Sequence, residues 1–433
     1  MTTQSERLYR RALEHVPAGV HSNSRIRTPY PLFVEKAEGQ WLEDADGRRW
    51  LDFTMGNGSV ILGHNHPAVQ EAVRNSLALG VTAGYETVAA VEAVELLAEV
   101  LPELRAVRFA NTGTEAVMHA LALARAATGR PRVAKVEASY HGWADAVWVS
   151  TWPPMDRVGP AHAPVNVPGS AGLSGEAATT LVLPFNDVSA TTQLFEQHGA
   201  ELAAVIIEPV MIDIGFVPAT RDFMQALRGL CNRFGVLLIF DELLTGFRIA
   251  SGGAREVYST TPDLTLYGKA IANGYPLAAV EGPRDLLDLS DPAKGGEVGW
   301  VGTYNGHATS MAAARASLAE LRSGAVVERL QQLTDRLTAG VAAIANDTGL
   351  DVVVAGGGGH FQPYFAADAP CDYRSAAGSD LACYADLVHV CRTETVLIAE
   401  GALGHCALSI AHSESDIDRL LTCIHESMTR TAG

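Results

Sequence analysis

The sequence is poor in several features that would assign a protein to a familiar class. Only six of its 433 residues are cysteines, and none forms a CxxC pair, which argues against a zinc site or a disulfide framework. Acidic residues outnumber basic ones by 49 to 32, and the net charge of −17 argues against nucleic acid or an anionic membrane as a partner. No apolar run approaches the roughly 18 residues of a spanning helix, and the first residues lack an apolar signal core. We therefore expect a cytoplasmic protein with reduced thiols.

What the sequence contains is typical of a large globular chain. Apolar residues make up 48% and charged residues 19%, a balance that excludes general disorder. The length allows two or three domains. Between residues 106 and 280 apolar runs alternate with helical patterns, without an internal repeat. This alternation predicts the α/β class, with a mostly parallel sheet and helices on both faces.

The expected elements follow one another closely. Helices are predicted at 5–16, 67–80, 87–101, 116–129, 189–198, 220–234 and 309–323, and strands at 106–110, 133–136, 180–185, 202–207, 236–240, 264–268 and 277–280. The composition then changes to a helix near 325–347, a hairpin turning within 356–359, a loop and a last helix. This C-terminal part indicates a smaller α+β domain, which we expect the N-terminal strands around the turn at 45–47 to join.

The stretch from 236 to 276 places a carboxylate and an amine at the ends of successive apolar runs. Asp241 follows the run 236–240, and ligands bind beyond the carboxyl ends of strands in such sheets. Lys269 follows the run 264–268 and is suited to be a desolvated, nucleophilic amine. Together they can hold pyridoxal 5′-phosphate (PLP), which needs an amine for a Schiff base and a carboxylate for its pyridinium nitrogen. Alternatively, Asp241 begins a helix or turn and Lys269 is solvated.

PLP also requires a phosphate site, and the segment NTGTEA at 111–116 offers one. It joins a strand to a long helix, whose free N–H groups and dipole bind phosphate, with hydroxyl donors from Thr112 and Thr114. Plain N-capping by one of these threonines, with Glu115 in the first turn, explains the same residues. Both interpretations stay open at this point.

Three further groups of residues are candidates for binding. Tyr140 lies in an aromatic cluster at a strand end, where a ring stacks on a planar cofactor or packs in the core. Arg25 and Arg27 lie in a segment with the composition of a loop. They either clamp a substrate carboxylate or are simply solvated. The loop at 152–176 is long enough to be a functional lid. His64 and His66 have no acidic or cysteine partner nearby in the sequence, and we expect no metal.

Taken in order, these segments resemble the class III PLP-dependent aminotransferases, and most of all their glutamate-1-semialdehyde aminomutase branch. The matching segments, which span nearly the whole chain, include AEGQWLEDADGRRWLDF, ILGHNHPAV, NTGTEA, YHGW, IIEPV, FDELLTGFR, GKAIANGYP, GTYNGHATS and AHSESDID. The resemblance implies the fold type I (aspartate aminotransferase-like) architecture and a homodimer with shared active sites. It implies an N-terminal segment at 1–55 that joins the small domain, a large PLP-binding domain at 56–310 and a small α+β domain at 311–433.

The resemblance also implies a role for each candidate residue. Lys269 would form the Schiff base, and Asp241 would pair with the pyridinium nitrogen. The remaining cofactor contacts would be the phosphate donors Gly113 and Thr114, the ring neighbours Tyr140 and Leu243, the nearby carboxylate Glu208, and Thr303, which would reach the cofactor of the partner subunit. Arg25 or Arg27 would bind the substrate carboxylate.

One departure from the aminomutase pattern bears on the reaction. Where that branch carries a glutamate, seven residues before Ala411, this chain has Gly404, and Glu400 lies four positions earlier. We therefore expect an intermolecular aminotransferase that acts on a carboxylate-bearing amino compound and a keto or aldehyde acceptor. The alternatives are an intramolecular aminomutase, a PLP racemase or epimerase, and a non-catalytic metabolite-binding α/β protein, although 111–116 lacks the GxGxxG spacing of dinucleotide sites.

Overall fold

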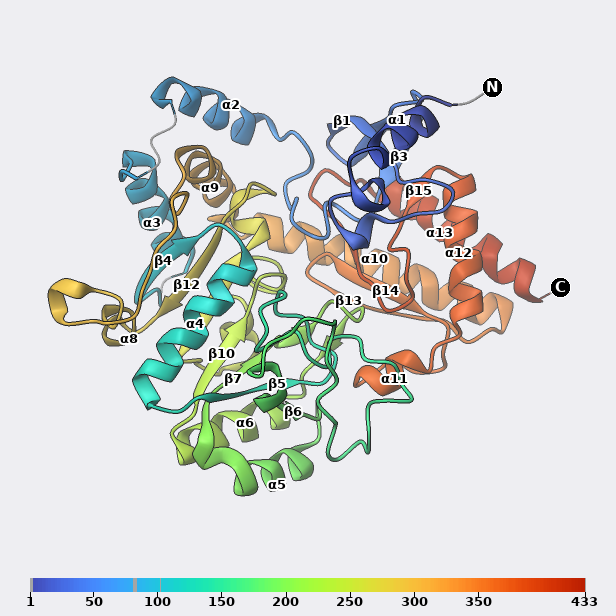
Figure 1. Ribbon diagram of the computed structural model, residues 1–433. Coiled ribbons are helices and arrows are strands. Elements are labelled where there is room, and N and C mark those ends of the chain that lie inside the picture. Colours follow the sequence, from blue (N-terminus) through green and yellow to red (C-terminus); the bar gives the residue numbers. More distant parts are fainter. Residues whose placement is uncertain (1–2, 81–83, 102, 433) are drawn as a thin grey trace.

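The computed structural model describes residues 3–80, 84–101 and 103–432 (Figure 1). Seven strands form its main sheet in the order β4-β12-β11-β10-β7-β5-β6. Their bounds are β4 (Ala106–Ala110), β5 (Arg132–Val136), β6 (Leu181–Leu183), β7 (Leu202–Ile207), β10 (Leu237–Asp241), β11 (Leu264–Gly268) and β12 (Ala278–Gly282). β12 runs antiparallel to both of its neighbours, and the other pairs are parallel. The predicted mostly parallel sheet is confirmed.

Both faces of this sheet are buried, which explains why its strands are apolar without alternation. Leu238 and Phe240 pack in one core with Leu227 of α6, whereas Ile239 between them packs in another core with Leu121 of α4. The covering helices are α4 (Gly113–Thr128), α5 (Val188–His198), α6 (Arg221–Phe234), α7 (Ala254–Tyr258) and α8 (Arg284–Asp288). The sheet is therefore fixed from both sides, and its strand ends are rigid supports for a site.

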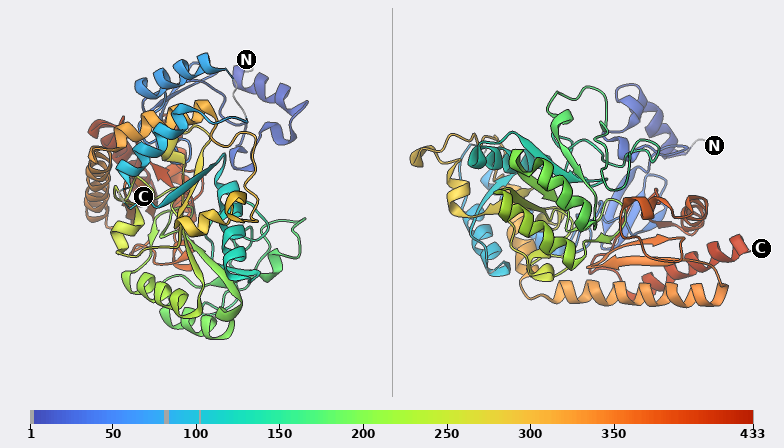
Figure 2. Two further views of the ribbon diagram at one scale, coloured as in Figure 1. Left: turned by 90° about the vertical axis from the view of Figure 1, so that its left-hand side faces the viewer. Right: turned by 90° about the horizontal axis from the view of Figure 1, so that it is seen from below.

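The N-terminal and C-terminal segments of the chain form two smaller sheets together with several helices. β1 (Val34–Glu38), β2 (Trp41–Asp44) and β3 (Arg49–Asp52) continue into β15 (Val396–Leu397), and β13 (Val353–Gly357), β14 (His360–Tyr364) and β16 (Cys406–Ala407) form the second sheet. Figures 1 and 2 show these blue and red segments side by side, with α10 (Ala325–Thr348) packed along α13 (Glu414–Ala432). The division at residues 55 and 310 stays a prediction.

Arg248 joins these parts across their seam. Its guanidinium is fully buried and donates to the carbonyl oxygens of Gly58 at 2.8 Å, Leu408 at 3.1 Å and Gly358 at 3.5 Å. Burial lowers the pKa of Arg248 to about 9. Because this value is still above neutral pH, the group stays charged there. One side chain that follows β10 thus holds segments from both ends of the chain against the main sheet.

Most predicted elements are present with small shifts at their ends. The remaining helices are α1 (Gln4–Leu13), α2 (Pro67–Ser76), α3 (Val88–Val100), α9 (Ala308–Leu321), α11 (Tyr373–Ala377) and α12 (Leu381–Thr393), and β8 (Val210–Met211) and β9 (Val217–Pro218) form a short hairpin. The prediction of a loop after the C-terminal hairpin was wrong, because this segment contains α11 and α12. α12 combines cysteine, tyrosine, valine, histidine and threonine, all of modest helix propensity, and packing on α13 stabilises it.

Two whole-chain findings complete the description. Within the described ranges, none of the helices has the length and apolar character needed to cross a bilayer. The cysteines form no disulfide among the described residues, and four of them are buried.

Candidate active site

The candidate residues lie at the carboxyl ends of parallel strands. Asp241 is the last residue of β10, Lys269 directly follows β11, and Glu208 directly follows β7. β10 pairs in parallel with both β7 and β11, and Asp241 lies opposite Leu266 in the register. The phosphate segment follows β4, and Tyr140 lies beyond β5. The sheet therefore gathers residues that are far apart in sequence at one edge.

The backbone around Lys269 is held in an uncommon conformation. Lys269 has a φ of 46°, in the left-handed region that non-glycine residues seldom occupy. The side chain of Asn273 fixes the turn, since it accepts from the N–H of Leu62 at 2.9 Å and donates to the carbonyl of Gly63 at 3.1 Å. Such strain persists where surrounding contacts enforce it and is common at functional sites.

Asp241 has a buried partner that the sequence did not reveal. Nδ1 of His141 lies 2.7 Å from Oδ2 of Asp241, and the His141 side chain is fully buried. Burial lowers the pKa of His141 and outweighs the hydrogen bond and charge of Asp241, which act in the opposite direction. The neutral imidazole thus donates from Nδ1 to Asp241. Its Nε2 has no hydrogen-bond partner among the described residues.

The start of α4 shows both features that its sequence allows, an N-cap and free N–H groups for a phosphate. Thr112 caps the helix by accepting from the N–H of Glu115 at 3.2 Å, and Glu115 accepts from the N–H of Asn111 at 2.7 Å. Within the described ranges, the N–H groups of Gly113 and Thr114 have no acceptor. Capping therefore uses Thr112 and leaves the next two donors free for an anion.

Tyr140 and Leu243 pack against different neighbours at this edge of the sheet. The Tyr140 ring stacks on Trp152 with centroids 5.3 Å apart and an interplanar angle of 10°. A Cβ on Gly113 would lie 2.6 Å from Leu243, and one on Gly268 would lie 2.4 Å from it. Leu243 thus fills the space between the phosphate segment and the end of β11, and a larger residue at Gly113 or Gly268 would have to displace its side chain.

Glu208 is placed by backbone donors. Its Oε1 accepts from the N–H of Tyr140 at 2.9 Å, and its Oε2 accepts from the N–H of Ile212 at 3.2 Å. Burial, followed by the charges of Asp213 and Asp241, raises the pKa of Glu208 well above its usual range, although the backbone donors oppose this. Glu208 therefore supports the position of Tyr140 more than it contributes charge.

The two candidate arginines have different surroundings. Nε of Arg27 lies 3.3 Å from Oε1 of Glu400, and that carboxylate also accepts from Arg392 at 2.7 Å. Arg27 is partly buried, whereas Arg25 is exposed, and no side-chain partner is found for Arg25 in the described part of the chain. Arg27 is therefore linked to the C-terminal segment, and Arg25 is not.

Thr303 lies on an exposed turn beside the phosphate segment. Oδ1 of Asn305 accepts from Nδ2 of Asn111 at 2.9 Å, which connects this turn to the start of α4. Thr303 also lines a surface pocket of about 680 Å³ together with Tyr85, with residues of α3 such as Val91, and with residues of β4.

Comparison with known protein families identifies the family of this chain. A family model described as aminotransferase class-III matches residues 22–359. The chain belongs to the class-III aminotransferases. It is similar to an omega-transaminase from Sphaerobacter thermophilus, with 33% identity, 100% of this chain and 98% of the other covered, and a TM-score of 0.92.

Two further solved structures are similar over almost the whole chain. One is a transaminase with PLP bound, with 33% identity, 100% and 98% coverage and a TM-score of 0.87. The other is a glutamate-1-semialdehyde aminomutase from Pseudomonas aeruginosa PAO1, with 26% identity, 98% and 94% coverage and a TM-score of 0.87. This class-III aminotransferase is therefore a PLP-dependent enzyme with the fold type I architecture, as predicted.

The residues present in this class-III aminotransferase fit PLP. The free N–H groups of Gly113 and Thr114 at a helix start suit the phosphate. Asp241 offers a carboxylate, oriented by His141, for a protonated ring nitrogen, and Lys269 offers an amine at the end of the next strand. A Cβ on Gly142 would lie 2.4 Å from Oγ1 of Thr114, which shows how closely the segment beyond β5 approaches this helix start.

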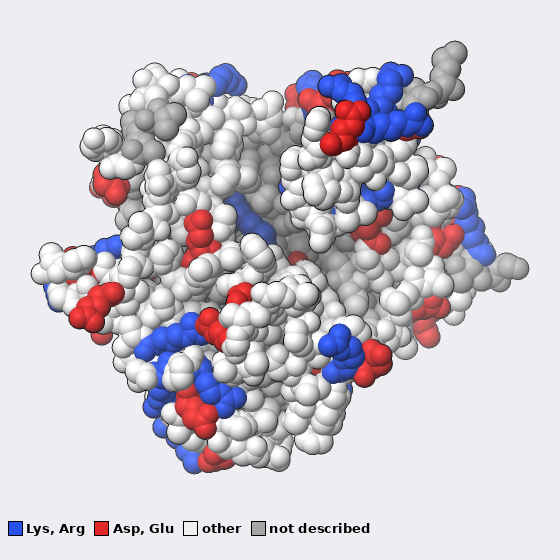
Figure 3. All heavy atoms as spheres, viewed as in Figure 1, with Lys and Arg blue, Asp and Glu red and all other residues white. Residues whose placement is uncertain are grey.

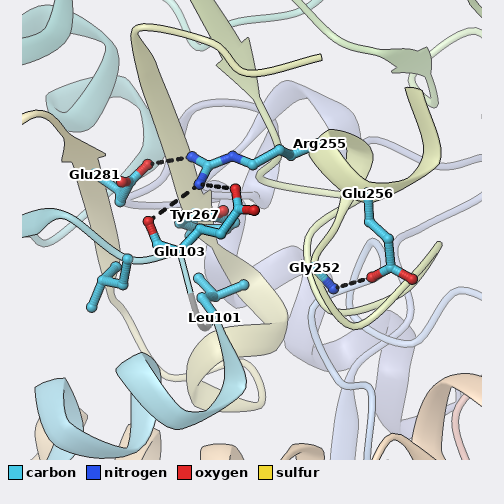
Figure 4. A pocket seen from close by; sticks show the side chains of 8 residues that line it. Leu101, Glu103, Gly252, Arg255, Glu256, Tyr267 and Glu281 are labelled. Atoms are coloured by element: carbon cyan, nitrogen blue, oxygen red, sulfur yellow. Dashed lines mark hydrogen bonds and ion pairs between the residues drawn. The ribbon is translucent and has the colours of Figure 1, made fainter. Parts of the chain in front are cut away.

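The surface of this class-III aminotransferase has more than one depression. The face drawn in Figure 3 is hollowed at its centre, between the region of α2 and α4 and the N-terminal elements, and a basic side chain is visible inside. A separate cavity of about 240 Å³ is shown in Figure 4. There Arg255 pairs with Glu281 at 2.9 Å and with Glu103 at 3.4 Å. The lining of this cavity includes none of the candidate residues. The cavity of Figure 4 is therefore distinct from the candidate active site.

Proposed function

We propose that this class-III aminotransferase moves an amino group between a carboxylate-bearing amino compound and a keto or aldehyde acceptor, and that Lys269 is the amine that bonds the cofactor. The placement of Lys269 directly after β11, beside the Asp241–His141 pair that ends β10, carries this proposal. An amine and an oriented carboxylate on adjacent parallel strands match the two ends of the PLP ring.

When bound, PLP supplies an aldehyde for the substrate amine and a ring that accepts electrons as a carbon–hydrogen bond breaks. The protein's share is to hold and move protons. Asp241, fixed by His141 at Oδ2 and by the N–H of Leu243 at Oδ1 (3.1 Å), would hold the protonated ring nitrogen. Nζ of Lys269, once free, would take the proton from the substrate carbon and hold it.

Arg27 is the better candidate for binding the substrate carboxylate. It is partly buried and paired with Glu400, whereas Arg25 points to solvent without a described partner. A substrate carboxylate that offers two oxygens to the guanidinium competes with the single contact at 3.3 Å from Glu400. In this proposal, the enzyme selects carboxylate-bearing substrates because the substrate carboxylate replaces the Glu400 carboxylate at Arg27.

The proposed functional unit is a homodimer. Large apolar side chains are exposed around the pocket that Thr303 lines, among them Tyr85 (83% exposed), Val88 (77%) and Val301 (87%). Exposed apolar groups gathered in one region are typical of interfaces. A second copy seated here would bring Thr303 toward its partner's phosphate site.

We also propose a cytoplasmic location. The lack of disulfides among the described cysteines, four of which are buried, supports a reducing compartment.

An intramolecular amino shift is the second candidate, because the similarity to the aminomutase extends over 98% of this chain. Glu400, however, is held by Arg27 and Arg392, and Gly404 carries no side chain. These two observations support the intermolecular reaction.

A visible absorption spectrum of the PLP-loaded protein tests this function. We expect the cofactor band to disappear with a suitable amino donor and to return when a keto acid is added. A product that forms at full rate without any keto or aldehyde acceptor would instead establish the intramolecular shift, or racemisation if only the stereochemistry of the substrate changes.

A further inference from the structure

The first part of the loop at 152–176 carries an aromatic ring to the candidate active site. The ring of Trp152 stacks on that of Tyr140, with centroids 5.3 Å apart and an interplanar angle of 10°. Trp148 meets these two rings at 84° and 86°, with its centroid 6.0 Å from each. Nε1 of Trp152 also donates to the main-chain carbonyl of Asp213 at 2.9 Å. Trp152 and Trp148 together therefore hold the plane of the Tyr140 ring.

Tyr140 is attached to the centre of the site through its backbone. Its N–H donates to Oε1 of Glu208 at 2.9 Å, and Nδ1 of the next residue, His141, lies 2.7 Å from Oδ2 of Asp241. These contacts fix the main chain at residues 140 and 141. The orientation of the Tyr140 ring depends in addition on Trp152. Because the Trp152 side chain is 42% exposed, its position is set by how the loop is held more than by burial in a core.

Tyr373 of α11 holds the loop directly beside Trp152. Its hydroxyl donates to the main-chain carbonyl of Pro153 at 2.6 Å, and its side chain is buried. Pro153 follows Trp152 in the chain, so this hydrogen bond fixes the backbone one residue away from the stacked ring. Val158, farther along the loop, packs in the same core as Tyr373. A residue of the C-terminal segment thus determines where the loop lies as it leaves the aromatic stack.

Arg374 holds the same loop a few residues later. Its guanidinium forms a bidentate ion pair with Glu137, with Nε 2.9 Å and Nη2 2.8 Å from the two carboxylate oxygens. Nη1 donates to the carbonyl of Gly159 at 2.8 Å, and Nη2 donates to those of Val158 at 3.3 Å and Pro160 at 3.4 Å. Glu137 directly follows β5, and its side chain is 7% exposed. Since bidentate pairs fix geometry as well as adding energy, the loop is tied both to α11 and to the end of β5.

We propose that Tyr373 and Arg374 are positioning residues for cofactor binding, because they hold the loop so that Trp152 keeps the Tyr140 ring against the cofactor. This inference rests on the proposed function, in which PLP binds beside Asp241. The two residues act through the loop, first on Trp152 and through it on Tyr140. The C-terminal part of the chain thereby contributes to the cofactor site of the main sheet.

The dissociation constant of PLP tests this role, because it reports on the site without requiring turnover. Tyr373→Phe removes the hydroxyl that bonds Pro153 and keeps the ring. It should raise the constant by about twofold to tenfold, the worth of one hydrogen bond. Arg374→Gln breaks more contacts and should raise the constant at least as much. The visible circular dichroism of the bound cofactor should weaken in both variants, since the Tyr140 ring is then held less firmly.

Tyr384→Phe is the matched control. Its buried hydroxyl donates to the carbonyl of Ala399 at 2.8 Å, so a bond of the same kind is lost away from the loop. The PLP dissociation constant and the dichroism should stay at their wild-type values. Trypsin cleavage after the exposed Arg157 reports on the loop itself. Cleavage should be several-fold faster in Tyr373→Phe and Arg374→Gln than in the wild type, and unchanged in the control.

A double-mutant cycle separates positioning from a general loss of stability. Trp152→Ala removes the ring that transmits the effect, so adding Tyr373→Phe to it should leave the PLP dissociation constant unchanged. A rise as large as in the wild-type background would overturn the proposal. A wild-type constant in Tyr373→Phe, despite faster cleavage after Arg157, would overturn it too. Should Tyr373→Phe not fold, Arg374→Lys keeps the charge, loses the bidentate contact and serves in the same cycle.

The proposed function fails by a different result. Attachment of PLP to a lysine other than Lys269 would refute that function, whatever the variants of Tyr373 and Arg374 show. Attachment to Lys269, combined with a PLP dissociation constant that ignores both residues, would refute the positioning role alone.

Discussion

At the scale of single residues, the site is made of pairs in which one member orients the other. His141 orients Asp241 from 100 positions away in sequence, and His405 contacts Asp213 from 192 positions away. Each of these contacts fixes the orientation of the carboxylate that it reaches. The same logic applies to Arg27, which Glu400 holds in place.

Removing His141 should reduce turnover while leaving the cofactor bound. We expect His141→Ala to lower kcat/KM by about 10- to 100-fold, the usual cost of losing a group that orients a cofactor ligand. His141→Asn places an amide donor where Nδ1 was and should be impaired less. Steady-state kinetics with an identified donor, together with PLP content, measures both, and an alanine variant as active as the wild type would show that Asp241 needs no orienting partner.

The Arg27–Glu400 pair predicts opposite effects for its two members. Glu400→Gln removes a competing anion and should lower KM for a carboxylate-bearing donor by about threefold, the worth of a partly exposed ion pair. Arg27→Ala should raise KM by about tenfold or more. Arg25→Ala is the matched control. A rise in KM for Arg25→Ala alone would reassign carboxylate binding to Arg25.

At the scale of elements, the strands and their carboxyl-terminal ends were predictable and the contacts between distant segments were not. Unbroken apolar runs that stop at Asp241, Glu208 and Lys269 are a local property, and so is the strand–turn–helix pattern around Gly113. The contacts of His141 with Asp241 and of His405 with Asp213 depend on which segments meet in space. The antiparallel direction of β12 and the helix α12 are likewise set by packing, because nothing in their own residues specifies them.

The segment beyond β5 depends on one buried lysine. Nζ of Lys135 donates to the carbonyls of Ser139, Val147 and Val149 and to Oγ1 of Thr151, at 2.6 to 3.0 Å. This holds in place the segment that carries Tyr140 and His141. Lys135→Met leaves these oxygens without their donor and should lower the free energy of unfolding by about 3 kcal/mol.

That loss should depend on pH in a defined direction. Burial lowers the pKa of Lys135 from 10.5 to about 7 in the folded chain. Between these values the unfolded chain binds more protons, so the contribution of Lys135 to stability increases as pH rises from 7. The difference in unfolding free energy between wild type and Lys135→Met should therefore be about 2 kcal/mol larger at pH 9 than at pH 7 in denaturant titrations. A difference that shrinks with pH would contradict a depressed pKa.

At the scale of the whole molecule, the two ends of the chain meet beside the main sheet. β3 pairs with β15, Arg248 bonds segments from both ends, and His405 brings the C-terminal part to Asp213. The candidate site is thus built where several parts of the chain converge. The proposed dimer would add Thr303 from a second copy.

A charge placed in the proposed interface should separate the subunits. We expect Val301→Asp to shift the protein from dimer to monomer in size-exclusion chromatography with light scattering, because a carboxylate would be buried against apolar groups. Leu381→Asp, at an exposed apolar residue at the start of α12, is the control and should stay dimeric. Val301→Asp that remains dimeric would place the interface elsewhere.

The central claim is that Lys269 is the residue that bonds the cofactor. The most direct measurement is to reduce the PLP-loaded protein with borohydride, digest it and locate the added cofactor mass by mass spectrometry. The account predicts that mass on the peptide containing Lys269, and no labelling in Lys269→Ala. Cofactor mass on another lysine, such as Lys135 or Lys294, would contradict it.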